Sequence, residues 1–304
     1  MSQDLEKVTS RLENIQKVKP ILTALRTISL GSWQMARNRR AGLQRYTHRL
    51  LDLLPWILPH IVERRPKLRL CSRGRDGGPD EGPVIALVIG SERGLCGRYN
   101  SRLLERFDRY QREQADAGRE VKTVALGSRL LREMASAGYE TTRSESLSMS
   151  SLPSYDTAAH YTSDWLEAYE SYELSAVDVL YNADRGAGTY ESVATRLIPP
   201  EMPPMERGSQ RDRMGVQPIV ETDPMRLYVH IVTEWTAITL YRLFLEAAQT
   251  VHLARFQLME SATQNADRLV DELTLTVQSA RRQAITREMQ ELAVGAGLLG
   301  GGSS

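Results

Sequence analysis

The chain has 304 residues, of which 39 are Lys or Arg and 38 are Asp or Glu, so its formal net charge is only +1. Its two cysteines, Cys71 and Cys96, have neither the spacing of a metal site nor the number needed for a disulfide framework. The polar N-terminal stretch lacks the apolar core of a signal peptide, and the absence of any run of about 18 apolar residues excludes a predicted membrane-spanning helix.

The charge is unevenly distributed along the chain. Residues 1–69 carry 14 basic and 5 acidic residues, whereas residues 70–224 carry 18 basic and 25 acidic ones. Between Asn14 and Leu51 there are eight basic residues and no acidic residue. Such an unmixed run indicates an electrostatic contact with an acidic partner, either protein or nucleic acid. The alternative is a helix face that is simply solvated.

The first predicted element is a helix over residues 3–62, which forms the N-terminal shaft helix at residues 1–62. Its apolar residues recur three and four positions apart, beginning with Leu5, Val8, Leu12 and Ile15. Pro20 interrupts this pattern, and because the apolar stripe continues beyond it, we expect a kink rather than an end. Pro55 and Pro59 predict that the helix bends or ends near its far terminus.

Residues 63–83 are rich in Gly, Pro and charge and form a predicted linker. Short apolar runs then alternate with amphipathic stretches through a central domain at residues 84–222. We predict strands over residues 84–90, 121–127, 177–181 and 191–198, and helices over residues 98–117, 128–137 and 157–174. This alternation is typical of a Rossmann-like α/β domain whose mostly parallel sheet is covered on both faces. Residues 199–218 are predicted to be irregular.

A second shaft helix is predicted over residues 223–299, followed by a flexible tail at residues 300–304. Between Met225 and Val294, 70 consecutive residues contain neither Gly nor Pro. A helix of that length is about 105 Å long and cannot be housed inside a globule of this size. Asp223 is expected to cap it, with Pro224 in its first turn. The two terminal helices are the natural partners for a long antiparallel coiled coil.

The loop between the first predicted strand and helix, Gly90–Asn100, is where an open α/β sheet would bind a phosphate. Its sequence matches neither the dinucleotide-binding pattern nor the P-loop, and no Lys follows its glycines. We therefore favour a tight turn that needs Gly94 and Gly97. The five histidines show no metal-ligand spacing, and Cys96 has no His near it in sequence. The sequence predicts no catalytic residue, no cofactor and no metal ligand.

Arg255 lies within the apolar seam of the C-terminal helix. Burying an arginine without a partner is costly. Its guanidinium is therefore expected either to reach the surface or to meet an acidic group on another chain.

Three segments resemble the gamma subunit of the F-type rotary ATP synthase. The C-terminal stretch resembles the C-terminal sequence pattern of the family. The matching residues are Ala254, Arg255, Met259, Ala262, Thr263, Asn265, Ala266, Leu273, Thr274, Leu275, Ala280, Arg281, Ile285, Thr286, Glu288, Glu291, Gly295 and Ala296. The loop Ser91–Asn100 is similar to the family's SDRGLCGGYN, and residues 179–191 form the third match. Together these segments lie at the family's spacing over most of the chain.

The resemblance implies that the two terminal helices form the central shaft inside a hexamer of alternating alpha and beta subunits. The α/β domain is then expected beside the epsilon subunit, on the membrane-embedded c-ring. The chain is expected to be a non-catalytic, peripheral subunit at the cytoplasmic face of a bacterial inner membrane. Its rotation couples ion transport to ATP synthesis or hydrolysis, without binding nucleic acid.

This chain departs from the family pattern at positions where, in the family, neighbouring subunits contact the shaft. Ser32 stands where the family usually has Lys, and Leu25 stands where Met is common. Near the C-terminus, Gln278 replaces the usual Asn and Arg282 replaces the usual Gln. They suggest a divergent branch, and they leave open whether the coupling ion is H⁺ or Na⁺. On the resemblance, we predict partner contacts at Leu25, Ser32, Arg37, Arg255, Gln278, Arg281, Arg282, Thr286 and Glu288.

Two other functions compete with a rotor shaft. The α/β domain could be a nucleotide-binding enzyme, which requires a phosphate at Gly94–Gly97. Alternatively, the basic helix could bind nucleic acid, with an affinity that falls steeply as salt rises.

Overall fold

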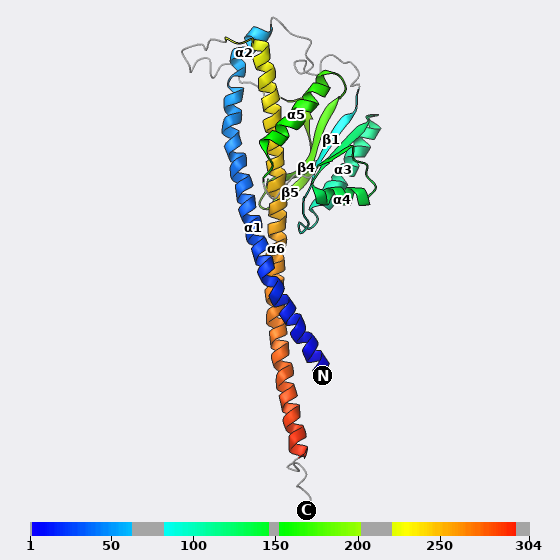
Figure 1. Cartoon of the computed structure of the whole chain (residues 1–304), viewed down its shortest axis with the longest axis vertical. Helices are drawn as coiled ribbons and strands as arrows, with labels where there is room; N and C mark the ends of the chain where they lie inside the picture. Colours follow the sequence, from blue (N-terminus) through cyan, green and yellow to red (C-terminus); the bar gives the residue numbers. More distant parts are fainter. Residues whose placement is uncertain (1, 63–81, 146–151, 202–220, 296–304) are drawn as a thin grey trace, which may run out of the picture. The chain divides into compact units, whose positions relative to one another are not determined.

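The structure is a computed structural model that describes residues 2–62, 82–145, 152–201 and 221–295 (Figure 1). Most of the predicted linker at residues 63–83, Cys71, most of the irregular segment at residues 199–218 and the tail at residues 300–304 lie outside the described residues. The chain divides into two compact units, one of Met1–Ser29 with Phe256–Ser304 and one of Leu30–Arg255. The predicted domains were bounded by the ends of helices and strands. The two compact units divide the chain differently, because each terminal helix contributes residues to both units.

The larger unit, Leu30–Arg255, is built on a five-stranded sheet with the order β3-β2-β1-β4-β5. Strands β1 (Val84–Ile89), β2 (Val121–Leu126), β3 (Arg143–Glu145) and β4 (Ala176–Gly186) run parallel, and β5 (Thr189–Ile198) is antiparallel to β4. A mostly parallel sheet was predicted, and it is confirmed. Strand β3 was not predicted because its three residues give no periodic signal.

Helices cover both faces of this sheet (Figure 1). On one face, α3 (Tyr99–Asp116) and α4 (Ser128–Ser136) bury Leu103, Phe107, Leu130 and Met134 against Ala86, Val88, Ala125 and Leu180. On the other, α5 (Tyr155–Glu170) and residues 240–248 of α6 (Pro224–Gly295) pack against Leu87, Ile89, Val124 and Val179. The two faces follow from the alternation of side chains along β1.

One predicted helix ends earlier than expected, and the N-terminal helix is divided near its far end as predicted, each for a local reason. The predicted helix over residues 157–174 ends at Glu170, because Tyr172 adopts a left-handed conformation with φ of 63°. The N-terminal helix is two helices, α1 (Ser2–Leu51) and α2 (Leu54–Val62). The break falls at Asp52 and Leu53, as predicted near Pro55, because a proline has no N–H to donate to the carbonyl four residues earlier, that of Leu51, and its ring crowds that carbonyl. Helix α1 continues through Pro20, and the predicted kink there stays a prediction.

The start of α6 is as predicted. Asp223 accepts a hydrogen bond from the Met225 backbone through Oδ1 at 3.2 Å and from the Leu227 backbone through its carbonyl at 3.1 Å. Pro224 occupies the first helical position, where its missing N–H has no helical partner to lose. Nearby, α2 and the end of α1 bury Leu50, Leu54, Ile57 and Ile61 against Ile231 and Ile238 of α6.

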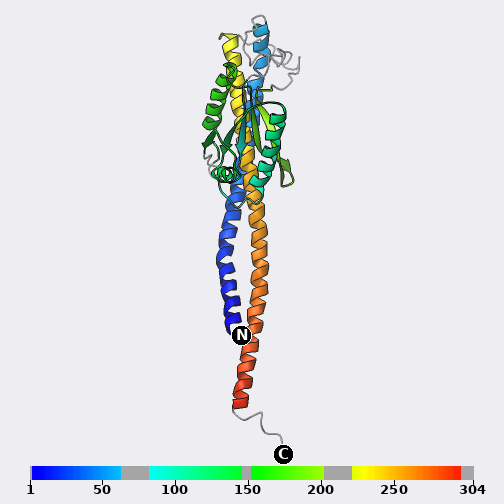
Figure 2. The same cartoon turned by 90° about the vertical axis from the view of Figure 1, so that its right-hand side faces the viewer.

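The smaller unit, Met1–Ser29 with Phe256–Ser304, is an antiparallel pair of helical segments from α1 and α6 (Figure 2). On α1, positions 5, 8, 12, 15, 19, 22, 26 and 29 are shielded, and on α6 so are positions 259, 263, 266, 270, 273 and 277. Both sets keep the alternating three and four spacing of a heptad. Within the described ranges, none of the helices combines the length and apolar character needed to cross a bilayer.

Candidate partner-contact surfaces

The Gly90–Asn100 loop is a rigid turn. The Ser91 backbone N–H donates to Asn100 Oδ1 at 3.0 Å, and Asn100 Nδ2 donates to Ser91 Oγ at 2.9 Å. The Glu92 carboxylate accepts hydrogen bonds from Ser128 N at 3.0 Å and Ser128 Oγ at 2.5 Å, at the start of α4. An anion at that helix start would meet a carboxylate already in place. This geometry disfavours anion binding at the start of α4.

The glycine requirement of this turn differs from the prediction. Gly97 does adopt a left-handed conformation with φ of 60°. Gly94 does not, and an added Cβ there would have nothing within 4 Å, so the prediction that the turn needs Gly94 is wrong. Close approach instead requires Gly90 and Gly127. A Cβ on Gly90 would lie 2.5 Å from Leu130 Cβ, and one on Gly127 would lie 2.8 Å from the Gly90 carbonyl oxygen.

Leu95 holds the left-handed position that a glycine would normally take. Its φ is 62° and the residue is 57% exposed. A left-handed conformation costs a non-glycine residue about 1–2 kcal/mol. Its neighbour Cys96 is buried against Val251 and Ala254 of α6, which fixes the loop beneath it. A strained and exposed leucine on a rigid loop is a candidate contact for another protein. The positive φ was not visible in the sequence, where Gly94 looked like the turn residue.

Arg255 lies half-buried on α6, close to this loop. Its Nη1 is 3.5 Å from Nδ1 of the buried His252, and desolvation by burial lowers the pKa of Arg255. Among the described residues, Arg255 makes no ion pair with a carboxylate. The guanidinium is therefore held half-buried beside His252, and its contact with an acidic group of another chain stays a prediction.

The basic run of α1 is used partly within the chain. In the smaller unit, Lys19 Nζ is 2.5 Å from Asp267 Oδ1, and Arg26 Nη1 is 2.8 Å from Glu260 Oε2. In the larger unit, Arg40 Nη2 is 2.8 Å from Glu246 Oε2. The prediction that the whole run faces an acidic partner is therefore too broad, because three of its eight cations meet carboxylates of α6.

The predicted contact residues on α1 fall outside these pairs. Leu25 and Ser32 are half-buried, and Arg37 is exposed. The Arg37 guanidinium lies 5.5 Å from the centre of the Trp33 ring, a cation–π contact that keeps the charge at the surface. Leu25 belongs to the smaller unit, where its neighbour Arg26 pairs with Glu260, and Ser32 belongs to the larger unit.

The C-terminal set lies on the final turns of α6. Its members are all exposed: Gln278, Arg281, Arg282, Thr286 and Glu288. The structure adds an apolar stripe that the prediction missed, formed by Ile285, Met289 and Leu292, which are 58%, 66% and 67% exposed. These three residues, here called the terminal stripe, are spaced four and three apart and share one helix face. Their spacing is readable from the sequence, but none of the predicted contacts included them.

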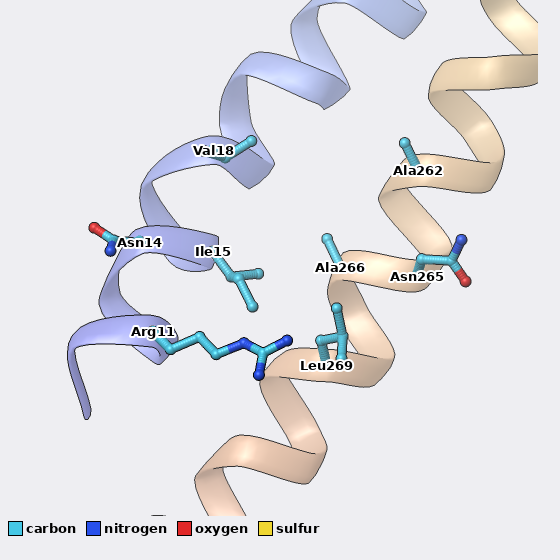
Figure 3. Close-up of a pocket in the computed structure, with 8 residues that line it drawn as sticks. All are labelled: Arg11, Asn14, Ile15, Val18, Ala262, Asn265, Ala266 and Leu269. Carbon is cyan, nitrogen blue, oxygen red and sulfur yellow. The ribbon is translucent and has the colours of Figure 1, made fainter. Parts of the chain in front are cut away.

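A shallow groove of about 470 Å³ lies between the two helical segments of the smaller unit (Figure 3). It exists because Ala262 and Ala266 of α6 face the larger side chains of Ile15 and Val18 on α1. In Figure 3 the amides of Asn14 and Asn265 point away from it. The Arg11 guanidinium reaches across the groove toward Leu269 in Figure 3, but a single charged group is not the set of converging polar groups found in a ligand site, so the groove is a packing gap.

Comparison with known proteins covers nearly the whole chain. The ATP synthase family model matches residues 4–299. The ATP synthase gamma chain of Rubrobacter xylanophilus is 28% identical, with 99% of each chain covered. That of Pelotomaculum thermopropionicum is 26% identical, covering 97% of this chain and 99% of the relative.

Solved structures share the fold. A chain of the Euglena gracilis mitochondrial ATP synthase, from the OSCP/F1/c-ring structure in rotational state 3, gives a TM-score of 0.60 at 15% identity, with 100% of this chain and 98% of that chain covered. A second Euglena gracilis chain, from the rotor in rotational state 1, gives a TM-score of 0.56 at 16% identity and covers 94% of this chain. The length of the family match, with relatives that are gamma chains from end to end, shows that this chain belongs to the ATP synthase family, among its gamma chains.

Proposed function

We propose that this chain is the central-stalk rotor subunit of an F-type ATP synthase. It makes and breaks no bond itself. Its rotation couples ion movement through the membrane sector to ATP synthesis or hydrolysis in a ring of alpha and beta subunits. The proposal includes contacts with the epsilon subunit and the c-ring, and a peripheral position at the cytoplasmic face of a bacterial inner membrane. The coupling ion, H⁺ or Na⁺, is set by the membrane sector.

The observation that carries this proposal is the terminal stripe. Ile285, Met289 and Leu292 expose apolar surface on a helix whose shielded seam ends at Ala280. Nothing within the described residues covers this stripe. Apolar surface in a continuous row favours a protein environment over water. A sleeve formed by surrounding subunits would supply that environment, with Arg281, Arg282 and Glu288 beside the stripe for polar contacts.

The competing functions receive less support. The Gly90–Asn100 loop has no Lys after its glycines and carries the acidic Glu92, whose carboxylate is bound at the start of α4. A nucleic-acid surface would need the cations of α1 to be free, and Lys19, Arg26 and Arg40 pair with carboxylates of α6. Across the described ranges, no cluster of His, Cys, Asp and Glu residues is arranged to hold a metal ion.

Purification of the tagged chain from its own cells, followed by identification of the co-purified proteins, tests the proposal. Alpha, beta and epsilon subunits are expected, and their absence would sink it. A second test removes the residues after Ser279. Because residues 281–292 are exposed, the truncated chain should unfold like the full chain but fail to assemble or couple. Replacing exposed Gln290 by Ser is the matched control. Full coupled synthesis by the truncated chain would show that the terminal stripe has no role.

A further inference from the structure

The strand order of the sheet reverses between β1 and β4, because β2 and β3 lie on one side of β1 while β4 and β5 lie on the other. In an open α/β sheet, the carboxyl ends of the strands form a ligand-binding crevice at such a point. Here α6 takes that place. Its Val251 and Ala254 pack against Cys96 and Tyr99, which follow the carboxyl end of β1. The position that would hold a ligand is thus covered by the chain's own helix.

Polar side chains of α6 meet the carboxyl end of β4 beside this contact. Glu246 Oε1 accepts a hydrogen bond from the Asp184 backbone at 3.1 Å, and Gln249 Nε2 donates to Asp184 Oδ2 at 2.8 Å. The Thr250 hydroxyl lies 2.9 Å from the Asn182 carbonyl oxygen, the shortest of its hydrogen-bond distances. Glu246, Gln249 and Thr250, here called the joint residues, lie within one turn and share one face of the helix.

The joint residues are shielded from water. They are 6%, 3% and 0% exposed in chain order, and Asn182 on β4 is 0% exposed. Asn182 is fixed in turn, because its Nδ2 donates to the Tyr99 carbonyl at 3.1 Å and its Oδ1 accepts from Ser192 Oγ at 2.5 Å. Hydrogen bonds in such a buried network are electrostatically stronger than exposed ones. The end of β4 is therefore held to α6 by polar contacts that water does not weaken.

Gln249 is poorly explained by stability alone. Its Oε1 has no hydrogen-bond partner among the described residues, although the residue is buried. A buried amide with one group unpaired costs stability, and an apolar side chain of similar shape can be as stable. What the amide adds is direction. Its hydrogen bond to Asp184 requires a narrow range of distance and angle, whereas apolar burial is not directional, so a turn of α6 against the sheet would break that bond.

We propose that the joint residues transmit torque between the shaft helices and the α/β domain. Glu246 links three elements, because Oε1 meets β4 while Oε2 lies 2.8 Å from Arg40 Nη2 on α1. Gln249 and Thr250 fix the rotational position of α6 on the sheet, while apolar contacts such as that of Leu240 supply stability and oppose rotation less. The inference deepens the proposed function and rests on it, since only a rotating stalk carries torque.

The test uses the complex purified from its own cells and placed in lipid vesicles, with ATP synthesis driven by imposed gradients of both H⁺ and Na⁺. Gln249→Met keeps most of the side-chain length and removes the amide. ATP synthesis should fall about tenfold, the factor for loss of a hydrogen bond to a charged group. ATP hydrolysis should stay level, because the hexamer can turn the shaft without passing torque to the α/β domain. The melting temperature of the purified chain should also stay level, and adding Thr250→Val should deepen the loss of synthesis.

Two control variants separate torque from stability. Leu240→Ala removes a buried apolar contact and should lower the melting temperature by more than Gln249→Met, with ATP synthesis retained. Thr250→Ser keeps the hydroxyl that faces β4 and should also retain ATP synthesis.

The remaining outcomes refute the inference. Full synthesis by Gln249→Met combined with Thr250→Val would show that the joint residues carry no torque. A loss of synthesis in Leu240→Ala as large as that in Gln249→Met would show that synthesis follows stability instead. In both cases coupled synthesis by the unchanged chain leaves the rotor assignment standing. Absence of alpha and beta subunits from the unchanged complex would refute the proposed function and the torque joint together.

Discussion

The ion pair between Arg40 and Glu246 joins α1 to α6 inside the larger unit and offers a quantitative test of the packing. The Glu246 side chain is only 8% exposed, whereas that of Arg40 is 32% exposed. Glu246 Oε1 also accepts a hydrogen bond from the Asp184 backbone at 3.1 Å. Replacing Arg40 by Met keeps most of the side-chain length and removes the charge, so the Glu246 carboxylate stays buried without its cation.

The expected cost follows from these exposures. Removing one partner of a fully buried ion pair costs about 3–5 kcal/mol. Here water reaches the Arg40 end and the Asp184 N–H remains, so we expect a loss of about 2 kcal/mol in the free energy of unfolding. For a unit of this size, that loss lowers the melting temperature by about 4–8 °C.

Urea and thermal unfolding, followed by circular dichroism, measure this change in the purified chain. Arg40→Met combined with Glu246→Gln should be less destabilised than the sum of the two single variants, because the double variant leaves no unpaired charge. Arg39→Met is the control, since Arg39 is exposed and has no carboxylate partner among the described residues. Equal losses for Arg39→Met and Arg40→Met, or strict additivity in the cycle, would refute the reasoning.

Three further predictions concern the α/β fold. Leu95→Gly should raise the free energy of unfolding by about 1 kcal/mol by relieving the left-handed strain, and should weaken assembly; an unchanged urea midpoint would contradict the strain. Gly90→Ala should destabilise the chain by about 1–3 kcal/mol because its methyl group overlaps Leu130, whereas Gly94→Ala should be neutral, and similar midpoints for both would contradict this. The hydrogen bond that Tyr139 donates to Asp108 raises the pKa of Tyr139 to about 12. The pKa of tyrosine in the unfolded chain is about 10. The stability that this raised pKa contributes to the folded chain is therefore complete below about pH 10 and is lost as the pH rises to about 12. Tyr139→Phe should therefore lose stability less steeply across that window, and identical slopes of the urea midpoint against pH would argue against it.

The fold was largely predictable because its signals are long or repeated. The heptad spacing that starts at Leu5 and the 70 residues free of Gly and Pro specify two long helices. Alternating apolar runs specify a covered parallel sheet, which the structure has. Short or single-residue determinants were missed. Strand β3 is three residues long, and the left-handed Tyr172 that ends α5 carries no mark in the sequence.

The contact surfaces were harder to predict because they depend on which partner each side chain meets. The basic run of α1 looked uniform in sequence. Only the structure separates Lys19, Arg26 and Arg40, which meet carboxylates of α6, from the exposed Arg45 and Arg49. The close glycines Gly90 and Gly127 lie 37 positions apart in the printed sequence, so their proximity depends on the pairing of β1 with β2.

The ion pairs between α1 and α6 are unevenly spaced, and this spacing specifies the register of the two helices. Lys19 and Arg26 are seven residues apart, and Arg40 follows after fourteen; Asp267, Glu260 and Glu246 mirror those intervals on α6. An apolar heptad seam alone would tolerate sliding by one heptad. A slip by one heptad would break all three pairs and would form only one new pair of opposite charges. That pair would be Lys19 with Glu260 for a slip in one direction, or Arg26 with Asp267 for a slip in the other. The three ion pairs therefore oppose a shift of α1 along α6 by one heptad when the shaft is under load.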